Sequence, residues 1–178
     1  MLQNQSKEIV IQISKTKLVL ITLGAWGFVL LAVWIWSGSE ELFSSPLISI
    51  TVAFIGIIFF GSCGVYGLVK FFDTKPGLII NSTGITDNSS GVSAGLILWH
   101  EITGISVKEM HSQKFLTIEV TDPQKYIARG NFIKRMFNAA NLKFYGSPIQ
   151  ISSTSLKTDF NSLVDIIFEN YKRYTADA

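Results

Sequence analysis

The sequence is poor in cysteine and in net charge, and both shortages limit what the protein can be. A single cysteine, Cys63, occurs among 178 residues, so no disulfide can form within the chain. Cys63 lies in an apolar run, where a cysteine usually behaves as a small buried hydrophobic residue. Fifteen lysines and arginines nearly balance thirteen aspartates and glutamates, so net charge gives no indication of a nucleic-acid partner.

Metal-binding and nucleotide-binding motifs are also lacking. His100 and Glu101 begin like an HExxH zinc motif, but position 104 is a glycine, so the second histidine is missing. The other histidine, His111, falls in a predicted hairpin turn. The chain has no P-loop and no GxGxxG motif. We therefore expect a protein that is not an enzyme, with no catalytic residues, no metal and no cofactor.

Two long runs, residues 18–36 and residues 47–69, contain no charged residue. A helix crosses a hydrocarbon core of about 30 Å with about 20 residues, so each run is long enough to span a membrane. Two buried core helices are an alternative, but so short a chain could hardly cover both. A cleaved signal peptide is the alternative for the first run, although its apolar stretch exceeds the usual length of about 7 to 15 residues. We favour two transmembrane helices.

The charges beside these runs predict an orientation. Lys15 and Lys17 precede the first run, whereas Lys70 and Lys75 follow the second. The connection, residues 37–46, contains two glutamates and no lysine or arginine. Because positive residues are retained on the cytoplasmic side, both termini are expected in the cytoplasm and the connection outside.

Small and aromatic residues have expected roles in this hairpin. Gly61, Gly64 and Gly67 recur every third residue, and we interpret them as allowing close packing within the hairpin. Aromatic residues near the ends of the runs are expected to anchor them at the membrane interfaces. These anchors are Trp34 and Trp36 on the outer side, and Phe71 and Phe72 on the inner side.

From Pro76 onward the pattern changes to short strands. Residues 114–120, KFLTIEV, alternate in the way typical of a half-buried strand. In residues 77–88 the pattern predicts strand, turn and strand, with Gly84 at the permissive turn position. Further strands are predicted at 96–99, at 104–110 and at 147–152. The first of them is expected to continue through His100 and Glu101.

The two ends of the chain complete the predicted fold. Before the first apolar run, Ile9, Ile11 and Ile13 alternate, which predicts a strand that joins the sheet of the C-terminal domain. The last segment predicts an amphipathic helix capped by Ser155 or Thr158. Its apolar residues at helical spacing are Phe160, Leu163, Val164, Ile167 and Tyr171.

Four stretches of the chain are LIINSTGITDNSS, GLILWHEITGI, FLTIEVTDP and YGSPIQIS. Placed after two spans and before a final amphipathic helix, they resemble a family of uncharacterised bacterial membrane proteins. That resemblance covers nearly the whole chain. It implies a membrane α-helical hairpin plus a mainly β, α+β domain, a pleckstrin-homology-like (PH-like) barrel or sandwich capped by a C-terminal helix. It also implies a multi-pass protein of the bacterial inner (cytoplasmic) membrane.

The expected organisation has five parts: a cytoplasmic leader with a short strand at 1–17, helices at 18–36 and 47–69, an external loop at 37–46, and a cytoplasmic PH-like domain at 76–174. One departure from phosphoinositide-binding PH domains is clear. No lysine or arginine occurs between Lys75 and Lys108, so an inositol-phosphate pocket of the usual kind is not expected.

A second amphipathic helix is predicted at residues 131–145, with Asn131 as its cap and Gly146 at its end. Lys134, Asn138 and Asn141 fall roughly opposite its apolar residues, and Leu142 does not fit the pattern. The apolar residues are Phe132, Ile133, Met136, Phe137, Ala140 and Phe144.

Two interpretations of this helix stay open. We favour its apolar residues packing on the domain's own sheet; the alternative is that they contact the inner leaflet. From Pro123 to Thr158 the chain has no acidic residue, and each lysine or arginine near an anionic surface contributes about 1 kcal/mol. The candidates to face lipid headgroups are Lys125, Arg129, Lys134, Arg135 and Lys143.

The expected function is a membrane-anchored binding or scaffolding module on the cytoplasmic face. Besides the bilayer, its partner would be a protein, a second copy of the chain, or anionic lipid headgroups; no nucleic acid is expected. The alternatives are a membrane-bound enzyme of unknown reaction and an accessory subunit of a membrane complex.

Overall fold

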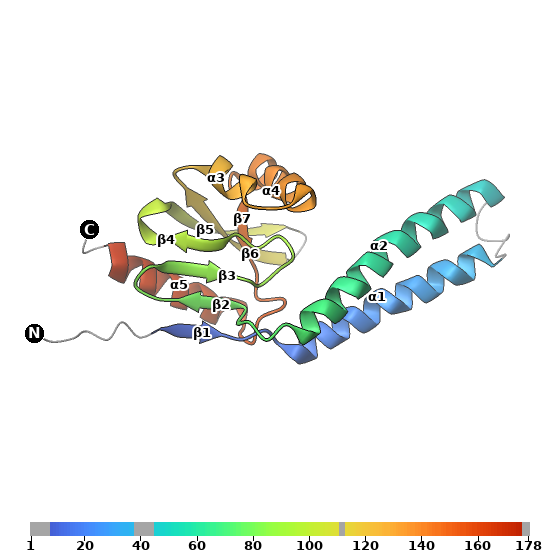
Figure 1. Cartoon of the computed structure of the whole chain (residues 1–178), viewed down its shortest axis with the longest axis horizontal. Helices are drawn as coiled ribbons and strands as arrows, with labels where there is room; N and C mark the ends of the chain where they lie inside the picture. Colours follow the sequence, from blue (N-terminus) through green and yellow to red (C-terminus); the bar gives the residue numbers. More distant parts are fainter. Residues whose placement is uncertain (1–7, 38–44, 111–112, 176–178) are drawn as a thin grey trace, which may run out of the picture. The chain divides into compact units, whose positions relative to one another are not determined.

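The computed structural model describes residues 8–37, 45–110 and 113–175, and it divides into two compact units (Figure 1). One is a helical hairpin within residues 15–74. The other joins residues 8–14 with residues 75–110 and 113–175, so the segment just before the hairpin belongs to the same folded unit as the residues after it. The glutamates of the predicted external loop and His111 lie outside the described residues.

The hairpin consists of α1 (Lys15–Trp36) and α2 (Pro46–Phe72). Both helices are long and apolar enough to cross a membrane. Each extends past the uncharged run that predicted it, because the backbone stays helical through the flanking lysines Lys15, Lys17 and Lys70. Pro46 occupies the first turn of α2, where its missing N–H removes no hydrogen bond.

The two helices run antiparallel and approach closely at two of the three predicted glycines. A Cβ atom on Gly67 would lie 2.1 Å from Oγ1 of Thr22, and one on Gly64 would lie 2.9 Å from the ring of Trp26. Gly61 would meet nothing within 4 Å. The prediction that these glycines allow close packing within the hairpin is therefore confirmed for Gly64 and Gly67 and wrong for Gly61.

The hairpin has small residues inside and large apolar residues outside. Its buried positions include Ala25, Ala32, Ser49 and Ala53, as well as the two packed glycines. Its large apolar side chains are mostly exposed, with Leu30 and Leu47 more than two-thirds exposed. This distribution is the reverse of that in a water-soluble helix pair.

The folded unit contains a four-stranded antiparallel sheet in the order β1-β2-β3-β4. Ile9 and Ile11 pair with Ile80 and Leu78, as the alternation at the N-terminus predicts. Ile13 forms a further bridge. The strands are β1 (Ile9–Ile11), β2 (Leu78–Ile80), β3 (Gly84–Asp87) and β4 (Gly95–Leu98).

Gly84 has a different role from the one predicted. Its φ is not positive, so the turn before β3 does not need its conformational freedom. The side chain of Asn81 makes the turn instead, accepting hydrogen bonds from the N–H groups of Thr83 (3.0 Å) and Gly84 (3.3 Å). Glycine is required because a Cβ atom here would lie 2.0 Å from the carbonyl oxygen of Ile97.

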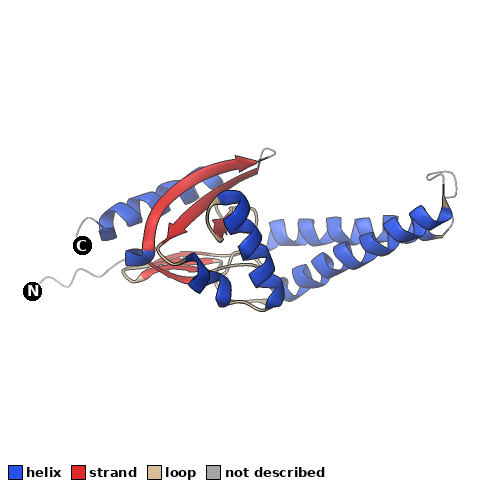
Figure 2. Ribbon diagram, turned by 90° about the horizontal axis from the view of Figure 1, so that it is seen from above, coloured by secondary structure: helices blue, strands red, loops and turns tan. Residues whose placement is uncertain are grey.

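The second sheet has three antiparallel strands in the order β5-β6-β7. Residues Trp99–Glu101 form a short 3₁₀ turn, η1, before β5, so the prediction of a strand there is wrong. The β5–β6 pair is long and curved (Figure 2), and its register shifts between Ile102 and Gly104. The strands are β5 (Ile102–Met110), β6 (Gln113–Val120) and β7 (Ile149–Ile151).

The C-terminal helix, α5 (Phe160–Thr175), completes an α+β fold with one core. Leu163 and Ile167 are fully buried, as the helical spacing predicts. Its cap is Asp159, whose Oδ1 accepts a hydrogen bond of 2.9 Å from the N–H of Ser162. The predicted caps, Ser155 and Thr158, are therefore wrong: aspartate stands one residue before the helix, in the capping position.

Two more helices, α3 (Pro123–Ala128) and α4 (Phe132–Tyr145), follow β6 in the chain and precede β7. They lie side by side (Figures 1 and 2). The sequence predicts α4 with its caps: Asn131 accepts a hydrogen bond from the N–H of Lys134, and Gly146 adopts a left-handed φ of 79°. The short helix α3, capped by Asp122, is not predicted.

Candidate membrane-facing surface

The surface of α4 is the feature that departs furthest from expectation. Phe132, Ile133, Met136, Phe137 and Phe144 are all exposed, with Phe132 at 80% and Phe144 at 73%. The favoured interpretation, that these residues pack on the domain's own sheet, is therefore wrong. We call these five residues the apolar face of α4.

The helix instead turns its polar side toward the folded unit. Asn138 is only 3% exposed, and Lys134, Asn141 and Leu142 are partly buried. Leu142, which does not fit the predicted apolar side, lies on this inner side. Periodicity identifies two sides of a helix, but only the contacts decide which one is inward.

The two ends of α4 hold this orientation. At its start, the guanidinium of Arg135 donates to the carbonyl oxygens of Gly130 (2.9 Å) and Ala128 (3.0 Å), at the end of α3. At its end, the Tyr145 ring lies 5.5 Å from that of Phe115, and Lys108 donates to the Tyr145 carbonyl. The helix is therefore fixed without using its apolar face.

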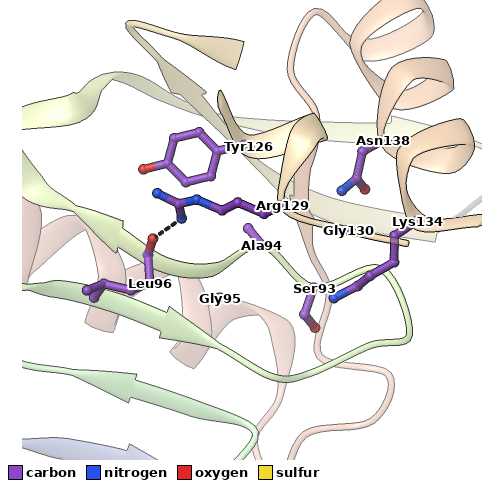
Figure 3. A pocket seen from close by; sticks show the side chains of 9 residues that line it. All are labelled: Ser93, Ala94, Gly95, Leu96, Tyr126, Arg129, Gly130, Lys134 and Asn138. Atoms are coloured by element: carbon purple, nitrogen blue, oxygen red, sulfur yellow. Dashed lines mark hydrogen bonds between the residues drawn. The ribbon is translucent and has the colours of Figure 1, made fainter. Parts of the chain in front are cut away.

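The five predicted headgroup-facing cations separate into different environments. Arg135 binds the end of α3, and Lys125 forms an ion pair with Glu101. Lys143 is exposed on α4. Arg129 and Lys134 both line a pocket between the loop before β4 and the helices α3 and α4 (Figure 3).

Glu101 links η1 to α3. Its carboxylate accepts hydrogen bonds from Lys125 and from the hydroxyl of Tyr126. The Lys125 ammonium and then the Tyr126 hydroxyl hold the pKa of Glu101 below its usual range. Burial, followed by the bond to Glu101, raises the pKa of Tyr126 to about 12.

The substitution Glu101→Gln should therefore lower stability in a pH-dependent way. Because the folded-state pKa is lowered, the wild-type advantage is complete above the pKa of an unfolded glutamate, about 4.3, and disappears as pH falls through the lowered value. We expect at most about 1 kcal/mol, since Lys125 is half exposed.

Urea unfolding of the full chain in detergent, followed by Trp99 fluorescence, measures this difference. Trp99 is buried in the core, and the other three tryptophans, all in α1, are replaced by phenylalanine. If Glu101→Gln lowered the free energy of unfolding equally at neutral pH and at pH 3, the ionised Glu101 carboxylate would not be the source of the stability.

The loop that forms one wall of the pocket is organised by Asp87. Its Oδ1 accepts from the N–H (2.9 Å) and hydroxyl (2.6 Å) of Ser89, and its Oδ2 accepts from the N–H of Ala94 (3.1 Å). Burial nevertheless raises the pKa of Asp87. The carboxylate is not among the groups that line the pocket.

One catalytic pattern escaped the sequence reasoning: residues 91–95 read GVSAG, which matches GxSxG. A nucleophilic serine in that pattern stands on a strand-to-helix turn beside a histidine. Ser93 instead lies between two antiparallel strands, and its hydroxyl donates to the Ser90 carbonyl at 2.8 Å. No histidine or carboxylate lines the pocket, and no group of three potential metal ligands occurs in the described residues.

The predicted interface anchors are all exposed on the hairpin. Trp34 and Trp36 lie in the last turn of α1, whereas Phe71 and Phe72 end α2. Close to the two phenylalanines, the Lys15 ammonium donates to the backbone carbonyl of Asp73 at 2.9 Å. The open end of the hairpin is thus both aromatic and cationic.

Comparison of the chain with family models, with curated proteins and with solved structures found no match. Interpretation of the surface therefore depends on its own chemistry.

Proposed function

We propose that this chain is a multi-pass protein of the bacterial inner membrane that holds a PH-like binding module against the anionic cytoplasmic leaflet, which α4 contacts. The hairpin supports the membrane assignment because it places small residues between its helices and large apolar residues outside. Lipid is the solvent in which such an exterior is stable.

Strand pairing supports an orientation with both ends on one side. β1 precedes α1 and β2 follows α2, yet the two strands pair within one folded unit. Two crossings bring the chain back to the side from which it started, and the flanking lysines favour the cytoplasm as that side.

The strand order supports the PH-like assignment. Antiparallel strands in two sheets, followed by one amphipathic helix, are the elements of the helix-capped barrel or sandwich that the family resemblance implies. The helices α3 and α4 are additions to that plan, inserted between the last two strands. A surface built on an addition is a good candidate for what is particular to this protein.

The observation that carries the proposal is the exposed apolar face of α4 in a segment with many cations and no acidic residue. Adjacent exposed apolar side chains mark interaction surfaces. An amphipathic helix with lysine and arginine near its apolar side binds anionic bilayers in the plane of the interface. Only three residues separate β1 from α1, and five separate α2 from β2, so the unit cannot move far from the helix ends.

A fluorophore on the apolar face tests this contact. The full chain carries Cys63→Ser and Phe137→Cys, is labelled with an environment-sensitive dye, and is reconstituted into phosphatidylglycerol vesicles. We expect a blue-shifted emission that spin-labelled lipids quench, because the dye enters the region of the headgroups and upper acyl chains. In phosphatidylcholine vesicles the signal should fall severalfold, since the cations then lose their attraction.

The matched control carries the dye at Asp165→Cys, an exposed position on α5. Its emission should remain that of a dye in water in both lipids. Equal emission and equal quenching at positions 137 and 165 would refute contact through α4.

A further inference from the structure

The pocket between the loop before β4 and the helices α3 and α4 has the properties of a ligand site. Its volume is about 240 Å³, below the range of about 300 to 1,000 Å³ that accommodates drug-sized ligands. A small polar molecule or a headgroup is the right size. Its polar side chains are Ser93, Tyr126, Arg129, Lys134 and Asn138 (Figure 3).

Two cations, Arg129 and Lys134, line this pocket, and no carboxylate is among its lining groups. The guanidinium of Arg129 donates to the carbonyl oxygen of Leu96 at 2.6 Å and lies 4.1 Å from the centre of the Tyr126 ring. These contacts fix its position, and the bond to Leu96 uses only one of its five N–H donors. In Figure 3 the side chain of Lys134 extends toward Ser93, on the opposite side of the pocket. A fixed guanidinium and a flexible ammonium are the usual partners of a phosphate group.

The third group is Asn138, which is 3% exposed and points into the pocket (Figure 3). Its Oδ1 is buried and accepts no hydrogen bond from any described residue. An unpaired buried acceptor is unfavourable, so a donor supplied by a ligand would stabilise the complex. The phosphate of a phosphodiester carries no such donor, whereas a hydroxyl group does.

We propose that this pocket binds a phosphoester that also carries a hydroxyl group. The phosphate oxygens accept hydrogen bonds from Arg129 and Lys134, and the ligand hydroxyl donates to Oδ1 of Asn138. The glycerol headgroup of phosphatidylglycerol has this chemistry, and so does free glycerol phosphate. The lipid source rests on the proposed function, since it needs α4 at an anionic leaflet; the free source does not.

Native mass spectrometry of the delipidated full chain in detergent tests the proposal. The probes are dihexanoyl phosphatidylglycerol, glycerol 3-phosphate, dihexanoyl phosphatidylmethanol, an anionic diester that lacks the headgroup hydroxyls, and dihexanoyl phosphatidylcholine. We expect phosphatidylglycerol to bind about tenfold more tightly than phosphatidylcholine, and Lys134→Met to lose about tenfold in affinity for it.

Asn138→Leu is the decisive variant because it replaces the amide with an apolar group of similar shape. It should lower the affinity for phosphatidylglycerol about fivefold and leave that for phosphatidylmethanol unchanged. Removing an amide whose buried Oδ1 has no partner among the described residues should not lower the urea midpoint, so the variant stays folded. Lys172→Met, which removes an exposed cation on α5, is the control and should bind as the wild type does.

The ligand source follows from the same titrations. Glycerol 3-phosphate that binds as tightly as the short-chain lipid supports a free phosphoester, whereas binding of the lipid alone supports a headgroup. Lys134→Met and Asn138→Leu variants that bind like Lys172→Met would overturn the site. The dye at position 137 reports leaflet contact separately, so failure of the site and failure of the proposed function are distinguishable.

Discussion

The Gly84→Ala substitution is expected to destabilise the folded unit by about 3 kcal/mol. The added Cβ atom would lie 2.0 Å from the carbonyl oxygen of Ile97, a backbone atom that cannot rotate away. Relief requires β3 and β4 to separate where Gly84 pairs with Leu98 and Ile85 pairs with Ile97. Urea unfolding followed by Trp99 fluorescence should show a correspondingly lower midpoint.

Gly95→Ala is the matched control, one strand away. Gly95 has a φ of 73°, but a Cβ atom there would meet nothing within 4 Å. Conformational strain alone should destabilise by about 1 kcal/mol. Equal midpoints for the two variants would show that β3 and β4 separate easily to make room for the added atom. That result would contradict the prediction for Gly84→Ala.

Gly84 also illustrates what the sequence can and cannot predict. A glycine between two short strands is correctly identified as special, but the reason is contact with Ile97, thirteen positions along the chain. Alternation and helical spacing are local, so β6, α4 and α5 are predicted from them. The helix α3 has only six residues, too few for periodicity to show.

The candidate site depends even more on contacts between distant segments. The absence of acidic residues from position 123 to 158 shows that cations gather here, but not which of them meet. The pocket joins residues 93–96 to residues 126–138, and no spacing rule links those segments. The orientation of α4 was predicted wrongly because apolar residues usually face a core; Leu142, the one misfit, was the only local sign of the reversal.

A chain that begins at residue 76 is expected to be strongly destabilised, although it contains most of the folded unit. It lacks β1, so the edge of β2 is open and the core loses the nearly buried Ile11 and Ile13 and the partly buried Ile9. Each such side chain contributes about 1.5 to 3 kcal/mol, and the total is on the order of 5 kcal/mol. Domains of this size have only about 5 to 15 kcal/mol of stability.

The comparison chain joins residues 8–14 through a short glycine-serine linker to residues 75–178 and omits the hairpin. Because Ile11 pairs with Leu78, a short linker can replace the hairpin without strain on β1. This chain should be folded, with dispersed NMR signals and a cooperative loss of Trp99 fluorescence in urea. Equal stability of the two chains would show that β1 is dispensable.

Deleting β1 both removes its packing and shortens the chain. A pair of point variants in the full chain tests the packing alone. Ile11→Asp places a carboxylate in the core and should unfold the unit, because a buried charge without a partner is strongly unfavourable. Val10→Asp alters the neighbouring position on the exposed side of the same strand and should change stability by less than about 1 kcal/mol. If α1 and α2 both cross the membrane, β1 and β2 can meet only after the second crossing. Ile11→Asp should therefore leave the hairpin inserted while the unit beside it becomes sensitive to protease.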